Sequence, residues 1–506
     1  MQLSGAAKEY ISGQGTTPFD KLMRQVYNSP AMSLHIGNNR HNLNNAHSAN
    51  TLNMTEGNPY RLIVQFAMPV FLSQVFQQLY NAADSVIVGQ YLGTDALAAV
   101  SSSGSLIFLF ISFFNGTALG AGVVISHCFG AGDEPGVSRA IHTDLAMGIV
   151  SGLVLTAAGV AFTPTLLVWM DTDPEVLPEA IEYFRYYFLG AIAVVLYNIC
   201  TGIMNALGDS RRPLIYLIIS SMTNVVLDLL FVGGFGWGVW SAAFATTVSQ
   251  AVSCVLCLYH LTRKGHIYSV SFRKIRFHWE TLKQMLRYGL PSGVQNSVTG
   301  LANVFVQTQI NSFAKFATAG FGSQSRIEGF AFIPIASFNM ALTTFIGQNL
   351  GAKQYDRAKN GARFGIVAAM ILAEIIGLLY YISAPYLIAL FDDSPEVIAY
   401  GVRQARIECL FYFLLAFSHT VAAICRGAGK AFVPMIIMLS TWCALRIAYI
   451  SAVMHIFGEI VYIYWAYPLT WATSSVIYLV YFLFSDWMLT PEEKRQKKSK
   501  FLKQSR

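Results

Sequence analysis

An aspartate inside an apolar run is the first feature of this sequence with the chemistry for a functional site. Asp84 lies in the stretch NAADSVIVGQYLG, which ends at Gly93. A carboxylate placed in hydrocarbon costs several kcal/mol, so an acid at this position is a functional hypothesis by default. The predicted helix begins near Tyr60, which puts Asp84 about 36 Å along it, with Tyr80 on the same face. The alternative is a carboxylate at the helix end that touches only lipid headgroups.

A second acid, Asp228, lies in the apolar stretch SSMTNVVLDLLFVGG. It is about 22 Å along a helix that begins near Pro213, and Asn224 lies one turn before it on the same face. Thr246 lies about 12 Å into the following span. We therefore expect Asp84, Asp228 and Thr246 to converge in the outer half of one bundle. Two carboxylates in low dielectric bind a proton, or a sodium ion between oxygen ligands.

The composition shows what kind of scaffold must hold these acids. Of 506 residues, 54% are hydrophobic and 12% are charged, whereas soluble proteins carry about 25% charged residues. The sequence therefore predicts an all-α polytopic membrane protein. The net charge of +7 is concentrated in short loops and one tail, which indicates topology signals and contacts with membrane lipids rather than nucleic-acid binding.

Apolar runs long enough to cross a membrane, about 20 residues each, recur from Tyr60 onward. We expect twelve transmembrane helices, at 60–89, 96–126, 137–163, 179–207, 212–233, 238–261, 284–312, 319–347, 357–390, 397–426, 431–456 and 459–487. The even-numbered connections are basic and the others are acidic. This bias predicts a multi-pass protein of the cell membrane with both termini in the cytoplasm.

The order of segments predicts five parts. They are a disordered N-terminal tail over 1–57, a first lobe over 58–262, a cytoplasmic linker over 263–283, a second lobe over 284–488 and a basic tail over 489–506. Met54, followed by TEGNP, is a more natural beginning than Met1, so we expect the first 53 residues to be an upstream extension.

Helix-breaking residues recur at one offset through the two halves. The pairs displaced by 221 positions include Pro164 and Pro385, Gly208 and Gly429, and Pro213 and Pro434, and Pro69 and Pro291 are displaced by 222. Because six spans is an even number, the repeats are parallel, and substrate sites in such transporters lie between the halves. We expect Pro69 and Pro291 to kink their helices. Gly208 is expected as a left-handed cap and Pro213 as the first residue of the fifth span.

The second half does not repeat the acid pair, since Tyr449 stands 221 positions after Asp228. Glu374 and Arg446 both fall near mid-span, so they are expected either to pair with each other or to leave Glu374 free for a cationic substrate. The other residues proposed for the cavity or for internal ion pairs are Gln295, Glu328 beside Arg326, Glu408 and His419. His419 either titrates or packs as a hydrogen-bonded histidine between helices.

Several stretches together resemble the multidrug and toxic compound extrusion (MATE) family, over essentially the whole of residues 58–487. They are QQLYNAADSVIVGQYLGTDALAAV, the MNALGDSRRP loop, NVVLDLLF, and RIEGFAFIP with GQNLGA. The resemblance implies a V-shaped transporter whose two lobes rock around a central cavity and exchange cationic drugs for protons or sodium. It further implies the prokaryotic branch with a proton site in the N-terminal lobe, on Tyr80, Asp84, Asn224, Asp228 and Thr246, with Asn198 lining the cavity.

One departure from the family pattern concerns the seventh helix. Family members with a cation site in the C-terminal lobe carry a glutamate a few turns after its proline, and the stretch after Pro291 has none. We therefore expect the N-terminal lobe alone to carry coupling.

These observations predict an antiporter that exports cationic or amphiphilic compounds, acting as a monomer without a cofactor or a metal site. A flippase for a lipid-linked or polysaccharide precursor is the alternative. An enzyme is not expected, because G-x-S-x-G and H-E-x-x-H motifs are absent and the acids are dispersed over separate helices.

Overall fold

The computed structural model describes residues 51–93, 96, 100, 116–169, 172–263 and 269–485. This part of the chain is helical, and no strand occurs within it. Nine of its helices are long and apolar enough to cross a membrane, and a bent helix pair makes ten. Most of the second predicted span, 96–126, falls outside the described residues, so the structure is consistent with twelve spans without counting all of them.

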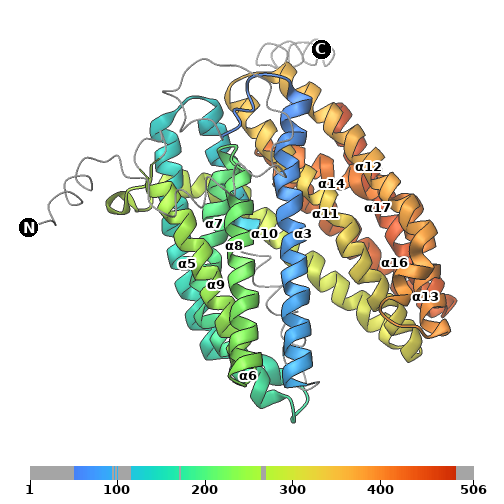
Figure 1. The fold of residues 1–506 in the computed structure, drawn as a ribbon. Helices are drawn as coiled ribbons and strands as arrows, with labels where there is room; N and C mark the ends of the chain where they lie inside the picture. Colours follow the sequence, from blue (N-terminus) through green and yellow to red (C-terminus); the bar gives the residue numbers. More distant parts are fainter. Residues whose placement is uncertain are drawn as a thin grey trace, which may run out of the picture. The chain divides into compact units, whose positions relative to one another are not determined.

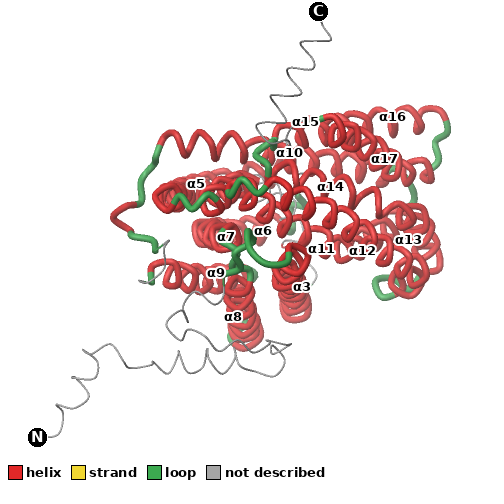
Figure 2. The backbone as a smooth tube through the Cα atoms, turned by 90° about the horizontal axis from the view of Figure 1, so that it is seen from above, coloured by secondary structure: helices red, strands yellow, loops and turns green. Residues whose placement is uncertain are grey.

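The first six-helix group begins with α3 (Pro59–Leu92), which runs without a break through Pro69. Its other helices are Gly116–Gly130, α5 (Glu134–Trp169), α6 (Leu177–Leu189), α7 (Ala191–Ala206), α8 (Arg211–Asp228) and α9 (Trp240–Thr262). Helices α6 and α7 are one span bent by 46° at Gly190. Figures 1 and 2 show α5 to α9 gathered side by side.

The second group begins with α10 (Trp279–Asn311), which starts inside the segment assigned to the linker. It continues with α11 (Lys315–Gly351), α12 (Tyr355–Ala389), α13 (Pro395–Glu408), α14 (Tyr412–Gly427), α15 (Phe432–Met438), α16 (Arg446–Ile456) and α17 (Ile460–Phe484). Pro291 lies inside α10 as Pro69 lies inside α3. The kinks at these prolines stay predictions.

The two groups have the same local geometry at equivalent positions, which supports the repeat. Gly208 follows α7 with φ +90°, and Gly429 follows α14 with φ +73°. In each case the next residue donates its backbone N–H back into the helix, Asp209 to Met204 and Lys430 to Cys425, both at 2.8 Å. The predicted left-handed cap at Gly208 is therefore confirmed.

Pro213 does not begin its span, because α8 starts at Arg211. The Asp209 carboxylate accepts from the backbone N–H of Arg212 at 3.3 Å. This bond stabilises the first turn of the helix, which begins before the proline. Proline fits anywhere in this first turn, since those N–H groups have no partner within the helix. The prediction of Pro213 as the first residue was wrong by two positions.

Candidate functional site

Helices α3 and α8 pack against each other and bring the two predicted acids together. Asp228 ends α8 and is fully buried, while Asp84 is half-buried on α3. Their carboxyl groups are near enough for a hydrogen bond between them, which requires that one of the two be protonated. The chain turns into a π-helical segment, Leu229–Gly234, directly after Asp228, and such segments are frequent at functional sites.

The other two predicted members of the site complete it from α8 and α9. Asn224 lies one turn before Asp228, is 1% exposed, and donates its amide to the hydroxyl of Thr246 at 3.4 Å. Apart from the contact between the two carboxyl groups, five buried oxygen atoms at this place have no hydrogen-bond partner: Asp84 Oδ1, both carboxylate oxygens of Asp228, Asn224 Oδ1 and Gln250 Oε1. Buried acceptors are expensive to leave unpaired. The cluster is therefore suited to hold a cation.

Three further side chains, Tyr183, Tyr187 and Gln250, surround the acid pair and were not found from the sequence. Tyr80, which was predicted, lies beside Gln77 and Gln250. Tyr183 and Tyr187, one turn apart on α6, lie near Asp84 and Tyr80, and their rings stack with centroids 6.3 Å apart. The spacing of four between the two tyrosines was the signal available. We refer to Tyr80, Asp84, Tyr183, Tyr187, Asn224, Asp228, Thr246 and Gln250 as the acid cluster.

The second group of helices contains a buried cluster that is centred on a positive charge, Arg446, and not on two acids. This residue is 1% exposed and donates to Asn303 Oδ1 at 3.3 Å and to the hydroxyl of Thr470 at 3.1 Å. Its guanidinium also lies over the rings of Tyr467, at 4.5 Å, and Trp442, at 5.2 Å. Such contacts stabilise a desolvated cation. Arg446 is thus held mainly by neutral partners from neighbouring helices.

Two glutamates lie in the electrostatic range of Arg446. Glu328 and Glu408 both interact with it and with each other. Glu408 is fully buried and accepts from the amides of Gln324 at 2.6 Å and Gln404 at 3.0 Å. We refer to Glu328, Glu408 and Arg446, with these amide partners, as the arginine cluster.

The predicted pairing of Glu374 with Arg446 is wrong. Glu374 lies on α12 and accepts the backbone N–H of Phe413 at 3.3 Å, whereas Arg446 contacts residues of α10 and α17. Arg326 does not pair with Glu328 either, because it is exposed and lies over the ring of Phe391 at 5.8 Å. A mid-span position fixes the height of a side chain in the membrane but not the direction in which it points.

The remaining predicted residues lie apart from both clusters. His419 packs edge-on against Phe332 and Trp442, with ring centroids 4.9 and 5.1 Å away. These contacts agree with the helix-packing alternative, while its hydrogen bond stays a prediction. Gln295 is 6% exposed on α10, and its Oε1 has no hydrogen-bond partner. Asn198 lines a cavity of about 240 Å³ between the groups, together with Asn205, Thr201, Met340 and Thr344.

This central cavity is closed at one end by a reciprocal pair of hydrogen bonds. His127 donates from Nε2 to the carbonyl of Gly427 at 2.8 Å, and Gln348 donates from Nε2 to the carbonyl of Ala206 at 2.9 Å. His127 and Gln348 are 221 positions apart, as are Ala206 and Gly427. Each group therefore donates to the end of the fourth span of the other. We refer to these four residues as the seal.

Glycines allow the seal to form. A Cβ at Gly130 would collide with the carbonyl of Gln348, and a Cβ at Gly351 would collide with the carbonyl of His127. These two glycines are also repeat partners, 221 positions apart. The seal lies at the ends of spans that are followed by Arg139 and Arg212, near the starts of α5 and α8, so it faces the basic side of the molecule.

Residues 51–58 lie across the seal, and we refer to them as the strap. Met54 is fully buried, its N–H donates to Gln348 Oε1 at 3.0 Å, and its carbonyl accepts from Asn349 at 3.1 Å. Arg357 donates to the carbonyls of Met54, Glu56 and Gly57. The segment had been assigned to the tail because its polar composition gives no periodic pattern.

One loop residue beside the strap is ionisable and buried. Asp209 is 1% exposed and forms an ion pair with Arg212 at 2.6 Å. Burial raises the pKa of the Asp209 carboxyl, and the charge of Arg212 acts in the opposite direction. The strap is joined to this loop because the N–H of Leu52 donates to the carbonyl of Gly208 at 3.0 Å.

The sequence profile of the family described as MatE matches residues 69–230 and 291–450, one match in each group of helices. The chain belongs to the MATE family. Among its MATE relatives is a probable multidrug resistance protein of Bacillus subtilis, YoeA, which is 28% identical over 435 residues, covering 84% of this chain and 94% of the relative. A FAD transporter of Shewanella oneidensis is 25% identical over 345 residues, covering 67% of this chain and 75% of the relative.

Solved structures agree with the MATE fold. A MOP superfamily transporter from Pyrococcus furiosus superposes with a TM-score of 0.81 at 23% identity, covering 86% of this chain and 98% of its own. A MATE family multidrug transporter in an outward-facing conformation gives a TM-score of 0.80 at 24% identity, with 85% and 96% covered. The chain is therefore a two-lobe integral membrane transporter, with α3 to α9 in the N-lobe and α10 to α17 in the C-lobe.

Proposed function

We propose that this MATE transporter exports cationic or amphiphilic drugs in exchange for protons. The observation that carries the proposal is the acid cluster, where two carboxyl groups are near enough to share a proton and five buried oxygen atoms have no donor. A proton satisfies such a site directly, because a protonated carboxyl donates to its neighbour. The relatives named as multidrug resistance proteins support the drug substrates.

The seal supports a cycle of alternating access. Positively charged loops face the cytoplasm, so the basic side carrying the seal is the cytoplasmic side, and both termini lie there in the cell membrane. With the seal formed, the cavity beside Asn198 and Asn205 is closed toward the cytoplasm. Protonation of the acid cluster from outside removes charge between α3 and α8, and the resulting change in packing releases the drug and reopens the seal inward.

Two classes of residue divide the work in this scheme. Asp84 and Asp228 exchange the proton, while Asn224, Thr246 and the surrounding tyrosines orient them. Asn198 and Asn205 supply polar contacts to a substrate in the cavity, whose other lining residues include Met340 and Leu119. A thioether side chain adapts to varied apolar shapes. Gln295, Glu328, Glu374, His419 and Arg446 stay candidates for substrate contact.

Purified protein in liposomes tests the proposal with imposed gradients. A cationic dye should be expelled under a pH gradient, and the Asp228→Asn variant should lose this transport while eluting as a folded monomer. Transport driven by a sodium gradient at constant pH would show that the coupling ion is sodium and not the proton. Equal transport by wild type and the variant would remove the acid cluster from coupling.

FAD, included as a second substrate because one relative carries it, tests the substrate class. Selective export of FAD without the dye would overturn the assignment to cationic drugs. The comparisons do not favour the flippase alternative, since the named relatives are multidrug resistance proteins and a FAD transporter.

A further inference from the structure

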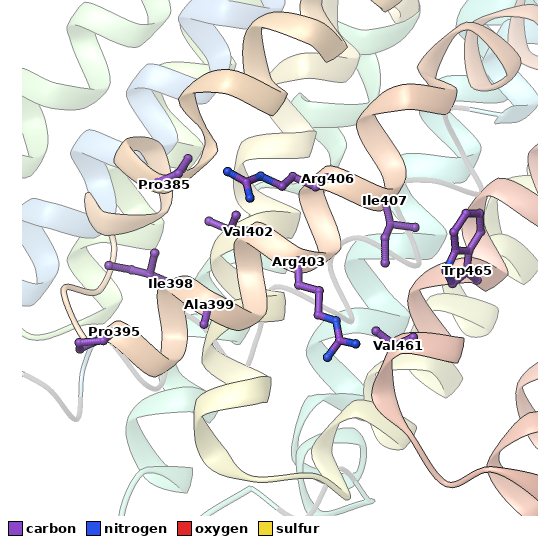
Figure 3. A pocket seen from close by; sticks show the side chains of 10 residues that line it. All are labelled: Pro385, Pro395, Ile398, Ala399, Val402, Arg403, Arg406, Ile407, Val461 and Trp465. Atoms are coloured by element: carbon purple, nitrogen blue, oxygen red, sulfur yellow. The ribbon is translucent and has the colours of Figure 1, made fainter.

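A groove on the outside of the C-lobe carries two arginines that the transport scheme does not use. It lies between α13, the end of α12 and the start of α17, and its volume is about 810 Å³. Figure 3 shows its lining, which is apolar apart from Arg403 and Arg406 and includes Pro385, Ile398, Val461 and Trp465. The groove opens on the membrane-facing surface, since Ile382 and Tyr386 on the adjoining turns of α12 are 72% and 78% exposed.

Within the part of the chain that the structure describes, the two arginines have no acidic partner. Both are exposed, they lie one turn apart on α13, and neither is in any of the ion pairs found among the described residues. The guanidinium of Arg406 lies over the ring of Tyr381 at 5.5 Å. In Figure 3 the side chain of Arg406 is directed toward Pro385 on α12, and that of Arg403 toward Val461 on α17.

Arg403 and Arg406 lie inside the membrane-spanning part of α13, so the lack of an acidic partner for them has to be explained. Pro395, the first residue of α13, is near the acidic face of the protein. Arg403 and Arg406 lie about 12 and 16 Å along the helix from it. Arginine at such a depth is costly unless it is neutralised or reaches the interface. An anion that comes from the membrane supplies the neutralising charge at this place, since basic pockets between membrane helices bind anionic lipid headgroups.

We propose that this groove binds an anionic phospholipid of the outer leaflet. Its phosphate lies in the groove that Arg403 and Arg406 both line, and its acyl chains cover Ile398, Val461 and Trp465. Arginine is suited to this role because its planar fork matches phosphate geometry. The site is separate from the acid cluster and the central cavity, so the proposal does not depend on the transported substrate.

Native mass spectrometry of the delipidated full chain tests the proposal with two probes, phosphatidylglycerol and phosphatidylcholine of identical acyl chains. We expect about tenfold stronger retention of phosphatidylglycerol by the wild type, and equal retention of the two lipids by the Arg403→Gln/Arg406→Gln variant. Equal retention by the wild type, or an unchanged preference in the double variant, would overturn the proposal.

Two further variants separate a lipid site from general effects. Arg326→Gln is the matched control, because Arg326 is exposed, lies about 16 Å along α11 from Lys315 and stacks on an aromatic ring, but does not line the groove. It should keep the preference, and its loss there would overturn the assignment to the groove. Arg403→Lys/Arg406→Lys keeps both charges and should retain most of the preference. If the glutamine variant fails to fold, the lysine variant and Trp465 quenching by brominated phosphatidylglycerol decide the matter.

Discussion

The acid cluster of the N-lobe and the arginine cluster of the C-lobe are two solutions to burying a pair of acids. In the N-lobe, Asp84 and Asp228 lie among tyrosines and amides, with no lysine or arginine near enough to pair among the described residues. In the C-lobe, Glu328 and Glu408 lie in the field of Arg446; Arg446 and Glu408 are fully buried and Glu328 is half-buried.

The difference indicates which lobe exchanges an ion with solution. The positive charge of the C-lobe is covalently part of the chain, so it balances one of the two glutamates in every state of the transporter. The N-lobe has no such charge, and its balance must come from an ion that enters and leaves. This contrast supports the proposal that the acid pair without an arginine is the coupling site and that the glutamates beside Arg446 are structural.

The largest effect is expected from neutralising the N-lobe acids. Asp84→Asn/Asp228→Asn should reduce gradient-driven dye efflux to the level of protein-free liposomes, because no exchangeable charge remains. Its thermal stability should be unchanged or higher, since two buried ionisable groups are removed. Efflux and thermal unfolding are measured on the same preparation, and Glu280→Gln, in the exposed first turn of α10, serves as the control. Equal loss of efflux in the control would break the comparison.

The reverse pattern is expected in the C-lobe. Arg446→Met leaves the fully buried Glu408 and the half-buried Glu328 without a cation, so we expect it to cost about 3–5 kcal/mol of stability. Thermal unfolding in detergent measures this. Adding Glu408→Gln should recover part of the loss, because it removes one of the uncompensated charges. A variant as stable as wild type would show that Arg446 is not the balancing charge.

The seal permits a comparison of true repeat partners. Gln348→Ala removes the bonds to Ala206 and Met54, whereas His127→Ala removes only the bond to Gly427. At about 0.5–1.5 kcal/mol for each hydrogen bond, the glutamine variant should shift the equilibrium toward the inward-open state more strongly. Reactivity of a cysteine introduced at Thr344, in the cavity wall beside the seal, reports the shift from the cytoplasmic side. Equal shifts would mean that the strap contributes nothing.

The smallest effect is expected at the edge of the acid cluster. Thr246→Val removes a long hydrogen bond of 3.4 Å to Asn224 and keeps the shape of the side chain. We expect a several-fold loss of transport at most, since Asp84 and Asp228 are retained. Asn224→Leu, which also removes an unpaired oxygen next to Asp228, should lose more. The same liposome assay ranks them, and a greater loss in the threonine variant would contradict this order.

The sequence predicted heights in the membrane better than directions around helices. Helical rise alone placed Asp84, Asp228 and Thr246 at compatible depths, and hydropathy placed the spans. Nothing in the sequence states which face of α6 turns toward α3, so Tyr183 and Tyr187 were missed. The same limit explains the wrong pairing of Glu374 with Arg446.

Features without periodicity or side chains were also beyond prediction. The strap is a short polar stretch with no hydrophobic pattern, and partners far along the chain hold it in place, such as Gly208, Gln348 and Arg357. The repeat offset was visible in the prolines and glycines. His127 and Gln348 occupy matching positions in this repeat. The sequence does not show their hydrogen-bond acceptors, so the reciprocal bonds could be recognised only in the structure.

Both acceptors of the seal are main-chain carbonyls, at Ala206 and Gly427. An alanine scan leaves Ala206 as it is, and any substitution at either position keeps the accepting oxygen in place, although a Cβ at Gly427 would collide with the carbonyl of Thr343. A single substitution can therefore delete the donor of each bond but not its acceptor. Mutations that affect gating in this transporter should therefore be found at the donor residues and the glycines beside them. Such mutations would not reveal the two accepting carbonyls.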